Sequence, residues 1–355
     1  MGVGSRLLAL LLGVALSAAL AELALRALRP ARLAIVRYPC IYRPDATTGF
    51  RYVPGASGVV AAHFEIENRV EINSLGFSDD EPLPPGRARP RILAAGDSFT
   101  AAMNVARHET WTAVLESTLR RSGLPQADVV NLGIDGTGTD VHAALLGDFG
   151  RTLRPDAAIL AFYANDVGDV RDGPFQRECY RGYVLSYPDP ERREALRARV
   201  DAHLEGRLRR GLYAHSFLAR LVANALLPAA HPYRMQFLQP RRSEIPERPP
   251  EAGRARWRAA LSALAELRGR CACRLLVVPV PPRSDPGGSL RAWRRHGDRD
   301  FEVLDVAPAL ERLRRERGLS HEALYFRHDL HLNPTGNALL GRAIAEAWLA
   351  NDRGS

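Results

Sequence analysis

Two short segments far apart in the sequence carry side chains suited to nucleophilic catalysis. Segment 96–100 (GDSFT) follows an apolar run, and segment 328–331 (HDLH) lies near the C-terminus. A serine attacks a carbonyl carbon when a histidine accepts its proton, and a carboxylate can hold that histidine in the required tautomer. We therefore predict Ser98 as a nucleophile, His331 as its base and Asp329 as the partner of the histidine.

Two further segments could supply donors to the oxygen that becomes negative during such an attack. Segment 131–138 (NLGIDGTG) is rich in glycine, which lets backbone N–H groups approach a substrate closely. Segment 162–166 (FYAND) contains Asn165, whose side-chain amide can donate to an oxyanion. Taken separately, each segment has a structural alternative: a turn for the glycines, and a helix cap for Ser98 or Asn165.

The elements that would position these segments alternate between apolar strands and amphipathic helices. Strands are predicted at 91–95, 128–131, 157–163, 274–280 and 302–305, and helices at 109–121, 140–153, 252–267 and 334–349. This alternation predicts a parallel sheet covered by helices on both faces. Ligands bind outside the carboxyl ends of the strands in such a sheet, which is where three of the four segments lie. We thus expect a three-layer α/β/α domain over 90–350, with about five parallel strands.

The rest of the chain falls outside this alternation. Residues 174–250 are predicted to be an insertion, helical from 190 to 226 and then proline-rich. Residues 26–89 are predicted to be a linker and a small β-rich region, with a short strand pair between 64 and 72. In segment 1–25, a basic start and an apolar run predict a signal peptide cleaved before Glu22 or an uncleaved membrane anchor.

Composition excludes several classes of protein. Hydrophobic residues make up 46% and charged residues 25% of the 355 residues, so the chain can form a core and is not disordered. The net charge is +9, but the basic residues are all arginines scattered along the chain, so we expect no nucleic-acid partner. No cluster of metal-ligand residues or cofactor motif is visible, and we expect neither a metal nor a cofactor.

Of the four cysteines, Cys40 and Cys179 are our first candidates for a disulfide, whereas Cys271 and Cys273 are either buried thiols or a second bridge.

The order and positions of the four segments resemble the SGNH hydrolases, the GDSL-like esterase superfamily. The resemblance implies a flavodoxin-like strand order. It implies that Ser98 is the nucleophile, that His331 and Asp329 complete a triad, and that Gly136 and Asn165 form an oxyanion hole with the Ser98 N–H. Segment 72–77 (INSLGF) also looks like membrane-tethered bacterial envelope members of the superfamily.

Three departures from the family pattern stand out. Phe99 replaces the usual leucine, and Tyr163 stands where a glycine is usual. The acid lies two residues before His331 instead of three, because position 328 is histidine; this variant is similar to the alginate O-acetylation proteins.

The resemblance leaves three functions open. The first is an ester hydrolase acting through an acyl-Ser98 intermediate on an O-acyl, for example acetyl, ester of an envelope carbohydrate. The second is an O-acetyltransferase that uses the same triad and an acyl-donor membrane partner, and the third is a non-catalytic envelope scaffold. We expect the chain to be exported to the periplasmic side of the bacterial envelope, although arginines at 26, 29, 32 and 37 would favour a cytoplasmic position by the positive-inside rule.

Overall fold

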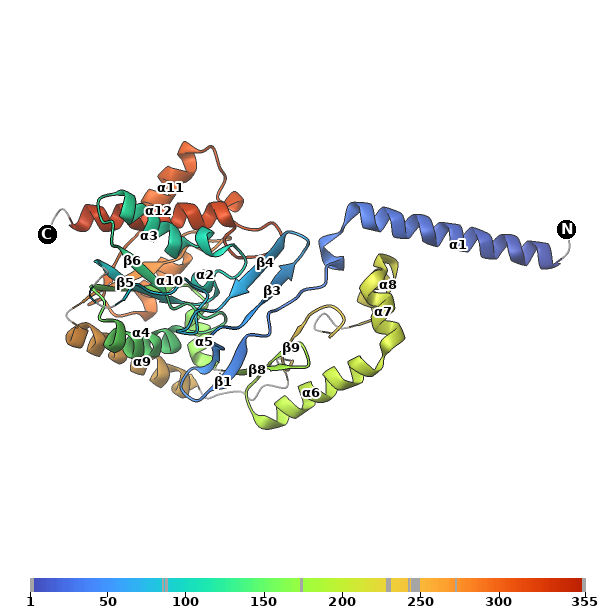
Figure 1. The fold of residues 1–355 in the computed structure, drawn as a ribbon, viewed down its shortest axis with the longest axis horizontal. Helices are drawn as coiled ribbons and strands as arrows, with labels where there is room; N and C mark the ends of the chain where they lie inside the picture. Colours follow the sequence, from blue (N-terminus) through green and yellow to red (C-terminus); the bar gives the residue numbers. More distant parts are fainter. Residues whose placement is uncertain are drawn as a thin grey trace.

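The computed structural model describes residues 3–352, except for 85, 87–88, 173–174, 228–230, 242, 244–249 and 272. A central sheet with helices on both faces forms the body, and one long helix, α1, projects from it (Figure 1). The chain termini lie at opposite ends of the molecule (Figure 1).

The central sheet has five strands, all parallel. They are β5 (Arg91–Gly96), β6 (Asp128–Asn131), β7 (Ala157–Phe162), β11 (Arg274–Pro279) and β12 (Glu302–Val303). Their order in the sheet is β12-β11-β7-β5-β6. Chain order therefore reverses between β5 and β7, as in flavodoxin-like sheets, and the predicted fold class is confirmed.

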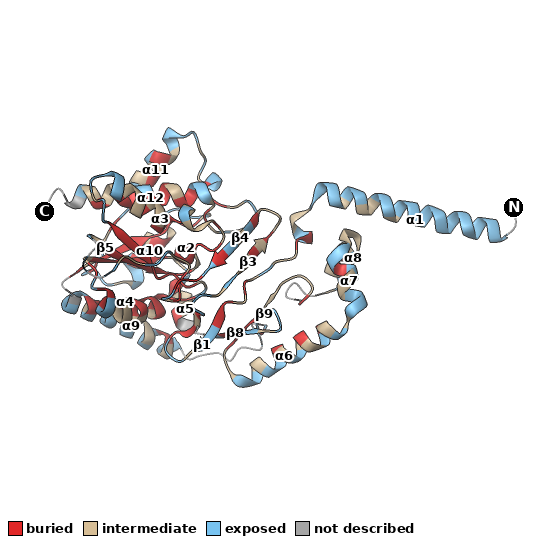
Figure 2. Ribbon diagram, viewed as in Figure 1, coloured by how far each residue is buried: buried red, intermediate tan, exposed pale blue. Residues whose placement is uncertain are grey.

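Two hydrophobic cores explain why the strands are short, continuous apolar runs. In β7, Ala158 and Leu160 belong to the core on one face of the sheet, and Ala157 and Ile159 to the core on the other. One face is covered by α4 (Thr139–Leu153), α5 (Asp166–Asp172) and α9 (Pro250–Cys271), and the other by α3 (Trp111–Arg121), α11 (Ala307–Glu316) and α12 (Pro334–Asp352). Buried residues are accordingly concentrated in the sheet and the inner faces of these helices (Figure 2).

Shorter elements complete this body. They are α2 (Ser98–Ala101), α10 (Gly288–His296) and the 3-10 helices η1 (Ala31–Leu33), η2 (Arg107–Glu109) and η4 (Glu322–Leu324).

The region before the central sheet forms two antiparallel hairpins. They are β1 (Tyr42–Asp45) with β2 (Gly49–Tyr52), and β3 (Ser57–Ala62) with β4 (Ile66–Glu71). The strand pair predicted between 64 and 72 is therefore wrong in its first strand, which lies before Phe64. His63 and Phe64 occupy the turn with φ values of 57° and 59°. Glycine, asparagine or aspartate usually marks such a turn, so the sequence carries no signal for it.

Residues 176–238 form a subsidiary unit beside the main body. A three-stranded sheet contains β8 (Gln176–Tyr180), β9 (Tyr183–Tyr187) and β10 (Phe237–Leu238), and three helices follow β9: α6 (Pro190–Glu205), α7 (Arg207–His215) and α8 (Phe217–Leu226). The helices lie within the span predicted to be helical, whereas the strands were not predicted. Cys40 and Cys179 form a disulfide with a Cα–Cα distance of 5.2 Å, the pairing expected first. Cys273 is also disulfide-bonded.

Helix α1 (Val3–Leu28) is exposed along almost its whole length (Figure 2). Among the described residues it is the one helix long and apolar enough to cross a membrane. Its C-terminal part contacts α8: the Glu22 carboxylate accepts hydrogen bonds from the backbone N–H groups of Phe217 (3.0 Å) and Leu218 (2.7 Å). The apolar helix is thus attached directly to the folded body.

Candidate active site

Ser98 lies directly beyond the carboxyl end of β5, as the first residue of α2. Asp97 caps this helix, because its side chain accepts a hydrogen bond of 2.9 Å from the backbone N–H of Phe99. Gly96 is required for space: a Cβ atom there would lie 2.2 Å from Thr100 Oγ1 and 2.9 Å from the carbonyl oxygen of Ala161. Close packing of α2 onto the end of β5 therefore leaves no room for a side chain at position 96.

Ser98, His331 and Asp329 form a continuous chain of hydrogen bonds. His331 Nε2 lies 2.8 Å from Ser98 Oγ, and His331 Nδ1 lies 2.5 Å from Asp329 Oδ1. Asp329 Oδ1 also accepts the backbone N–H of His331 at 2.9 Å, so an Asp-x-His spacing suffices to orient the ring. A neutral imidazole held in this way has Nε2 free to accept a proton from Ser98.

The charges and hydrogen bonds around His331 favour protonation of its imidazole. Burial alone would lower the pKa of His331, but the hydrogen bond and negative charge of Asp329 raise it above its usual value. Burial would likewise raise the pKa of Asp329, yet the hydrogen bond and charge of His331 lower it. Burial raises the pKa of Asp97 to about 6, although the Phe99 N–H and the charge of His331 oppose this change.

The two residues expected in the oxyanion hole have different surroundings. Gly136 lines the same cavity as Ser98 and His331, and its φ of +65° is one that glycine adopts without strain. Asn165 is exposed just before α5, and its backbone carbonyl accepts the N–H of Gly168 at 2.7 Å, as a helix-capping residue does. Its side-chain amide donates to Asp169 at 2.9 Å. At least one of its two amide protons is thereby engaged.

Phe99 and Tyr163, two of the departures from the family pattern, contact each other. Their rings stack with centroids 4.2 Å apart and an interplanar angle of 23°. The Phe99 ring also lies 5.0 Å from the ring of His331. The larger side chain at 163 therefore packs against the larger side chain at 99, beside the histidine.

The cavity beside Ser98 has a volume of about 210 Å³ and contains charged residues that sequence reasoning missed. Arg177 is buried and donates to Asp135 Oδ2 at 2.7 Å, and its guanidinium lies 4.1 Å from the centre of the Phe50 ring. A Cβ atom on Gly136 would lie 2.3 Å from Arg177 Nη2. Arg177 comes from β8, in the segment treated as an insertion, and no sequence pattern around it distinguishes it from the other arginines.

The loop that carries His331 is held by the β3–β4 turn. Glu65 accepts the backbone N–H groups of Arg327 (3.0 Å) and His328 (2.8 Å). Phe64 stacks on Phe217 of α8, with ring centroids 5.8 Å apart. His328 therefore helps to hold the loop through its backbone N–H. The β3–β4 turn contacts both this loop and α8.

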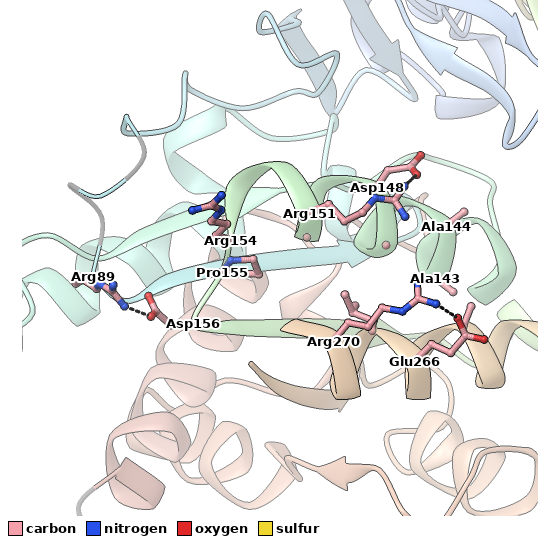
Figure 3. A pocket seen from close by; sticks show the side chains of 14 residues that line it. Arg89, Ala143, Ala144, Asp148, Arg151, Arg154, Pro155, Asp156, Glu266 and Arg270 are labelled. Carbon is pink, nitrogen blue, oxygen red and sulfur yellow. Dashed lines mark hydrogen bonds and ion pairs between the residues drawn. The ribbon is translucent and has the colours of Figure 1, made fainter. Parts of the chain in front are cut away.

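A second hollow of about 710 Å³ lies between α4 and α9 (Figure 3). It is lined by ion pairs, including Arg270 with Glu266 at 3.1 Å and Arg89 with Asp156. Asp156 precedes β7, so this hollow lies at the amino end of the sheet, opposite Ser98. Within the described part of the chain, no group of three His, Cys, Asp or Glu side chains could hold a metal ion.

The strand order, with a serine hydrogen-bonded to a histidine at the carboxyl edge of the sheet, is that of the SGNH-type α/β fold. Residues 94–339 match the GDSL-like Lipase/Acylhydrolase family, and the chain belongs to this family. No curated protein matches the sequence.

Several solved structures are similar in fold at low sequence identity. TesA has 14% identity and a TM-score of 0.39, with 72% of this chain and 97% of TesA covered. The acetylxylan esterase Axe2 from Geobacillus stearothermophilus has 13% identity and a TM-score of 0.38, with 73% and 94% covered. The esterase EstA from Pseudoalteromonas sp. has 14% identity and a TM-score of 0.36, with 74% and 100% covered.

Proposed function

We propose that the protein is a serine ester hydrolase that acts through an acyl-Ser98 intermediate. The observation that carries this proposal is the hydrogen-bonded chain from Ser98 through His331 to Asp329. His331 removes the proton of Ser98 as Oγ attacks the ester carbonyl, and then protonates the leaving alkoxide. In the second half of the reaction a water molecule attacks the acyl-enzyme, again with His331 as base, and releases the acid and Ser98.

The oxyanion of each tetrahedral intermediate is assigned to three donors: the backbone N–H groups of Ser98 and Gly136 and the side-chain amide of Asn165. Gly136 beside Ser98 in one cavity supports this assignment. Asp329 holds the imidazole and stabilises its protonated form.

The substrate we propose is a short-chain ester, such as an acetyl ester, of an envelope carbohydrate. A cavity of about 210 Å³, bordered by Ala62, Ala101 and Met103, suits a small acyl group. The apolar helix α1 and the Cys40–Cys179 disulfide support a position on the periplasmic side of the envelope, where disulfides persist. A periplasmic reporter fused after Ser355 should be active in a bacterial host, and a cytoplasmic reporter at the same point should be silent.

The experiment that tests the hydrolase assignment is turnover of a chromogenic acetate ester by the full chain in detergent. A fluorophosphonate should label Ser98, as read by mass spectrometry. Ser98→Ala should lower turnover by about a millionfold or to background. Retention of a tenth of the activity would show that Ser98 is not the nucleophile.

The Asp-x-His spacing favours a second candidate, an O-acetyltransferase with a sugar hydroxyl as acceptor and a membrane acyl donor. The same acyl-Ser98 intermediate would form, and the two functions differ in what attacks it. Adding a carbohydrate acceptor to the acetate-ester assay distinguishes them: a transferase yields acetylated sugar at the expense of free acetate, whereas a hydrolase yields the same acetate with or without sugar.

A further inference from the structure

Helices α7 and α8 form a surface that is both cationic and apolar. Residues 206–227 contain four arginines and no aspartate or glutamate. One arginine, Arg220, is buried and donates to backbone carbonyl groups, whereas Arg207 and Arg209 are exposed. Large apolar side chains are exposed beside them: Leu208 (77%), Leu212 (54%), Val222 (54%) and Leu226 (78%). We call these six exposed residues the α7–α8 surface.

Part of this surface is hollowed into an apolar groove of about 810 Å³. Leu212, Val222 and Leu226 line it, with Arg209 at its border. Exposure of these apolar side chains to water is unfavourable, because burial would remove their apolar surface from water. The groove is therefore better suited to contact with apolar groups than with water.

The position of the α7–α8 surface identifies its partner. Helix α8 begins against α1: Glu22 accepts the backbone N–H groups of Phe217 and Leu218 and the hydroxyl of Ser216 (2.9 Å), and Arg26 donates to the carbonyl oxygen of His215. In Figure 1, α7 and α8 lie at the end of the body from which α1 leaves. With 26 residues at about 1.5 Å each, α1 is roughly 39 Å long, enough to cross a hydrocarbon core of about 30 Å.

We propose that the α7–α8 surface lies on the bilayer that α1 enters, with its leucines among the acyl chains and its arginines at anionic headgroups. Helices with arginine on one side and leucine on the other bind anionic membrane interfaces in this orientation. The charge complements phosphatidylglycerol-type lipid, and the apolar side chains continue the lipid-facing surface of α1. This inference does not depend on the chemistry at Ser98.

The test uses the full chain in vesicles of dibrominated phosphatidylcholine and phosphatidylglycerol, because bromine on acyl chains quenches nearby tryptophan. Leu212→Trp and Leu226→Trp place a probe on the surface, and Ala350→Trp, near the end of α12 on the opposite side of the molecule, is the matched control. The fluorescence of the unsubstituted chain, with its four native tryptophans, is subtracted. We expect bromolipid quenching of the two surface probes to be several times that of the control, and aqueous iodide to quench them less than the control.

Two outcomes would overturn the proposal. Probes at 212 and 226 that respond to iodide and bromolipid as Ala350→Trp does would show that the surface faces water. Probes shielded from both quenchers would show that a second copy or another protein covers it.

The contribution of the exposed arginines is tested with the Leu226→Trp probe. In the Leu226→Trp background, Arg207→Glu with Arg209→Glu should reduce bromolipid quenching at least twofold in phosphatidylglycerol vesicles, while Arg207→Lys with Arg209→Lys should retain it. Equal quenching in both variants would contradict the role of the arginines. Helix α1 is unchanged in all of them, and an unchanged far-ultraviolet circular dichroism spectrum and thermal melt verify that each variant is folded.

Discussion

Glu65 and His328 are 263 residues apart, yet a carboxylate oxygen of the first lies 2.8 Å from the backbone nitrogen of the second. The other carboxylate oxygen accepts the N–H of Arg327. Hydrogen bonds to a charged acceptor are worth about 1.5–3 kcal/mol, so Glu65 fixes the start of the loop that carries Asp329 and His331.

Loss of this carboxylate should lower turnover as well as stability. We expect Glu65→Ala to lower kcat by about tenfold and Glu65→Gln by less, because a Gln oxygen still accepts one N–H. Glu67→Ala, at an exposed position of the same hairpin, is the matched control and should leave kcat unchanged. Equal rates for Glu65→Ala and Glu67→Ala would contradict a positioning role.

The pH dependence of kcat/KM should report the raised pKa of His331. In the proposed mechanism the neutral imidazole is the base, so activity should rise with pH through a midpoint above the usual value of 6.5. Asp329→Asn removes the charge that raises this pKa, so its residual activity should be lower and its midpoint should move to lower pH. An unmoved midpoint would show that another group is titrated.

Substitutions at Asn165 distinguish a role in catalysis from a role in helix capping. If its amide donates to the oxyanion, Asn165→Ala should lower kcat by roughly 10²–10³ with little change in KM. Asn165→Asp should be worse, because a carboxylate would oppose both the oxyanion and Asp169. If Asn165 only caps α5, Asn165→Ala should instead lower the stability of the protein by about 1 kcal/mol, and Asn165→Asp should keep its activity. Initial rates beside thermal melts decide between the two roles.

The stacked rings of Phe99 and Tyr163 should be energetically coupled. Phe99→Leu and Tyr163→Gly each restore the residue usual in the family and should each destabilise the protein, since one ring then loses its partner. In the double variant we expect a coupling of about 0.5–1.5 kcal/mol in urea unfolding. Additivity within about 0.5 kcal/mol would mean that the two departures are independent.

The disulfide should contribute substantially to stability, because Cys40 and Cys179 close a loop across 139 positions. Cys40→Ser with Cys179→Ser should lower the free energy of unfolding by about 2–5 kcal/mol. Both chains are unfolded in urea without reductant, because reductant would also break the disulfide of Cys273. A difference below about 1 kcal/mol would contradict this expectation.

Sequence reasoning reached the features that have local signals. Apolar runs such as 157–162 and their spacing gave the parallel sheet, and the segments at 96–100 and 328–331 identified the side chains that the structure brings within hydrogen-bonding distance. These succeed because the carboxyl ends of parallel strands must converge on one edge of the sheet.

Features that depend on contacts between distant, unremarkable residues were out of reach. Arg177 enters the cavity from a strand that was taken for part of an insertion, and nothing in its neighbourhood marks it as different from other arginines. Glu65 lies beside a turn whose His63 and Phe64 have positive φ without glycine or asparagine. Such a turn is maintained by its tertiary contacts, with Phe64 on Phe217 and Glu65 on the His331 loop, and no local pattern encodes them.

If α1 crosses a bilayer as proposed, the direct contact of Glu22 with α8 also limits how far the cavity beside Ser98 can move relative to that bilayer. A flexible linker would let the cavity occupy many positions above the bilayer. A helix that contacts the folded body restricts the cavity to few positions. In a chain that keeps α1, the opening beside Ser98 would stay at one height and in one orientation. Under the proposed function, an ester substrate would have to reach that layer, so encounter would depend on the mobility of the substrate and not on movement of the cavity.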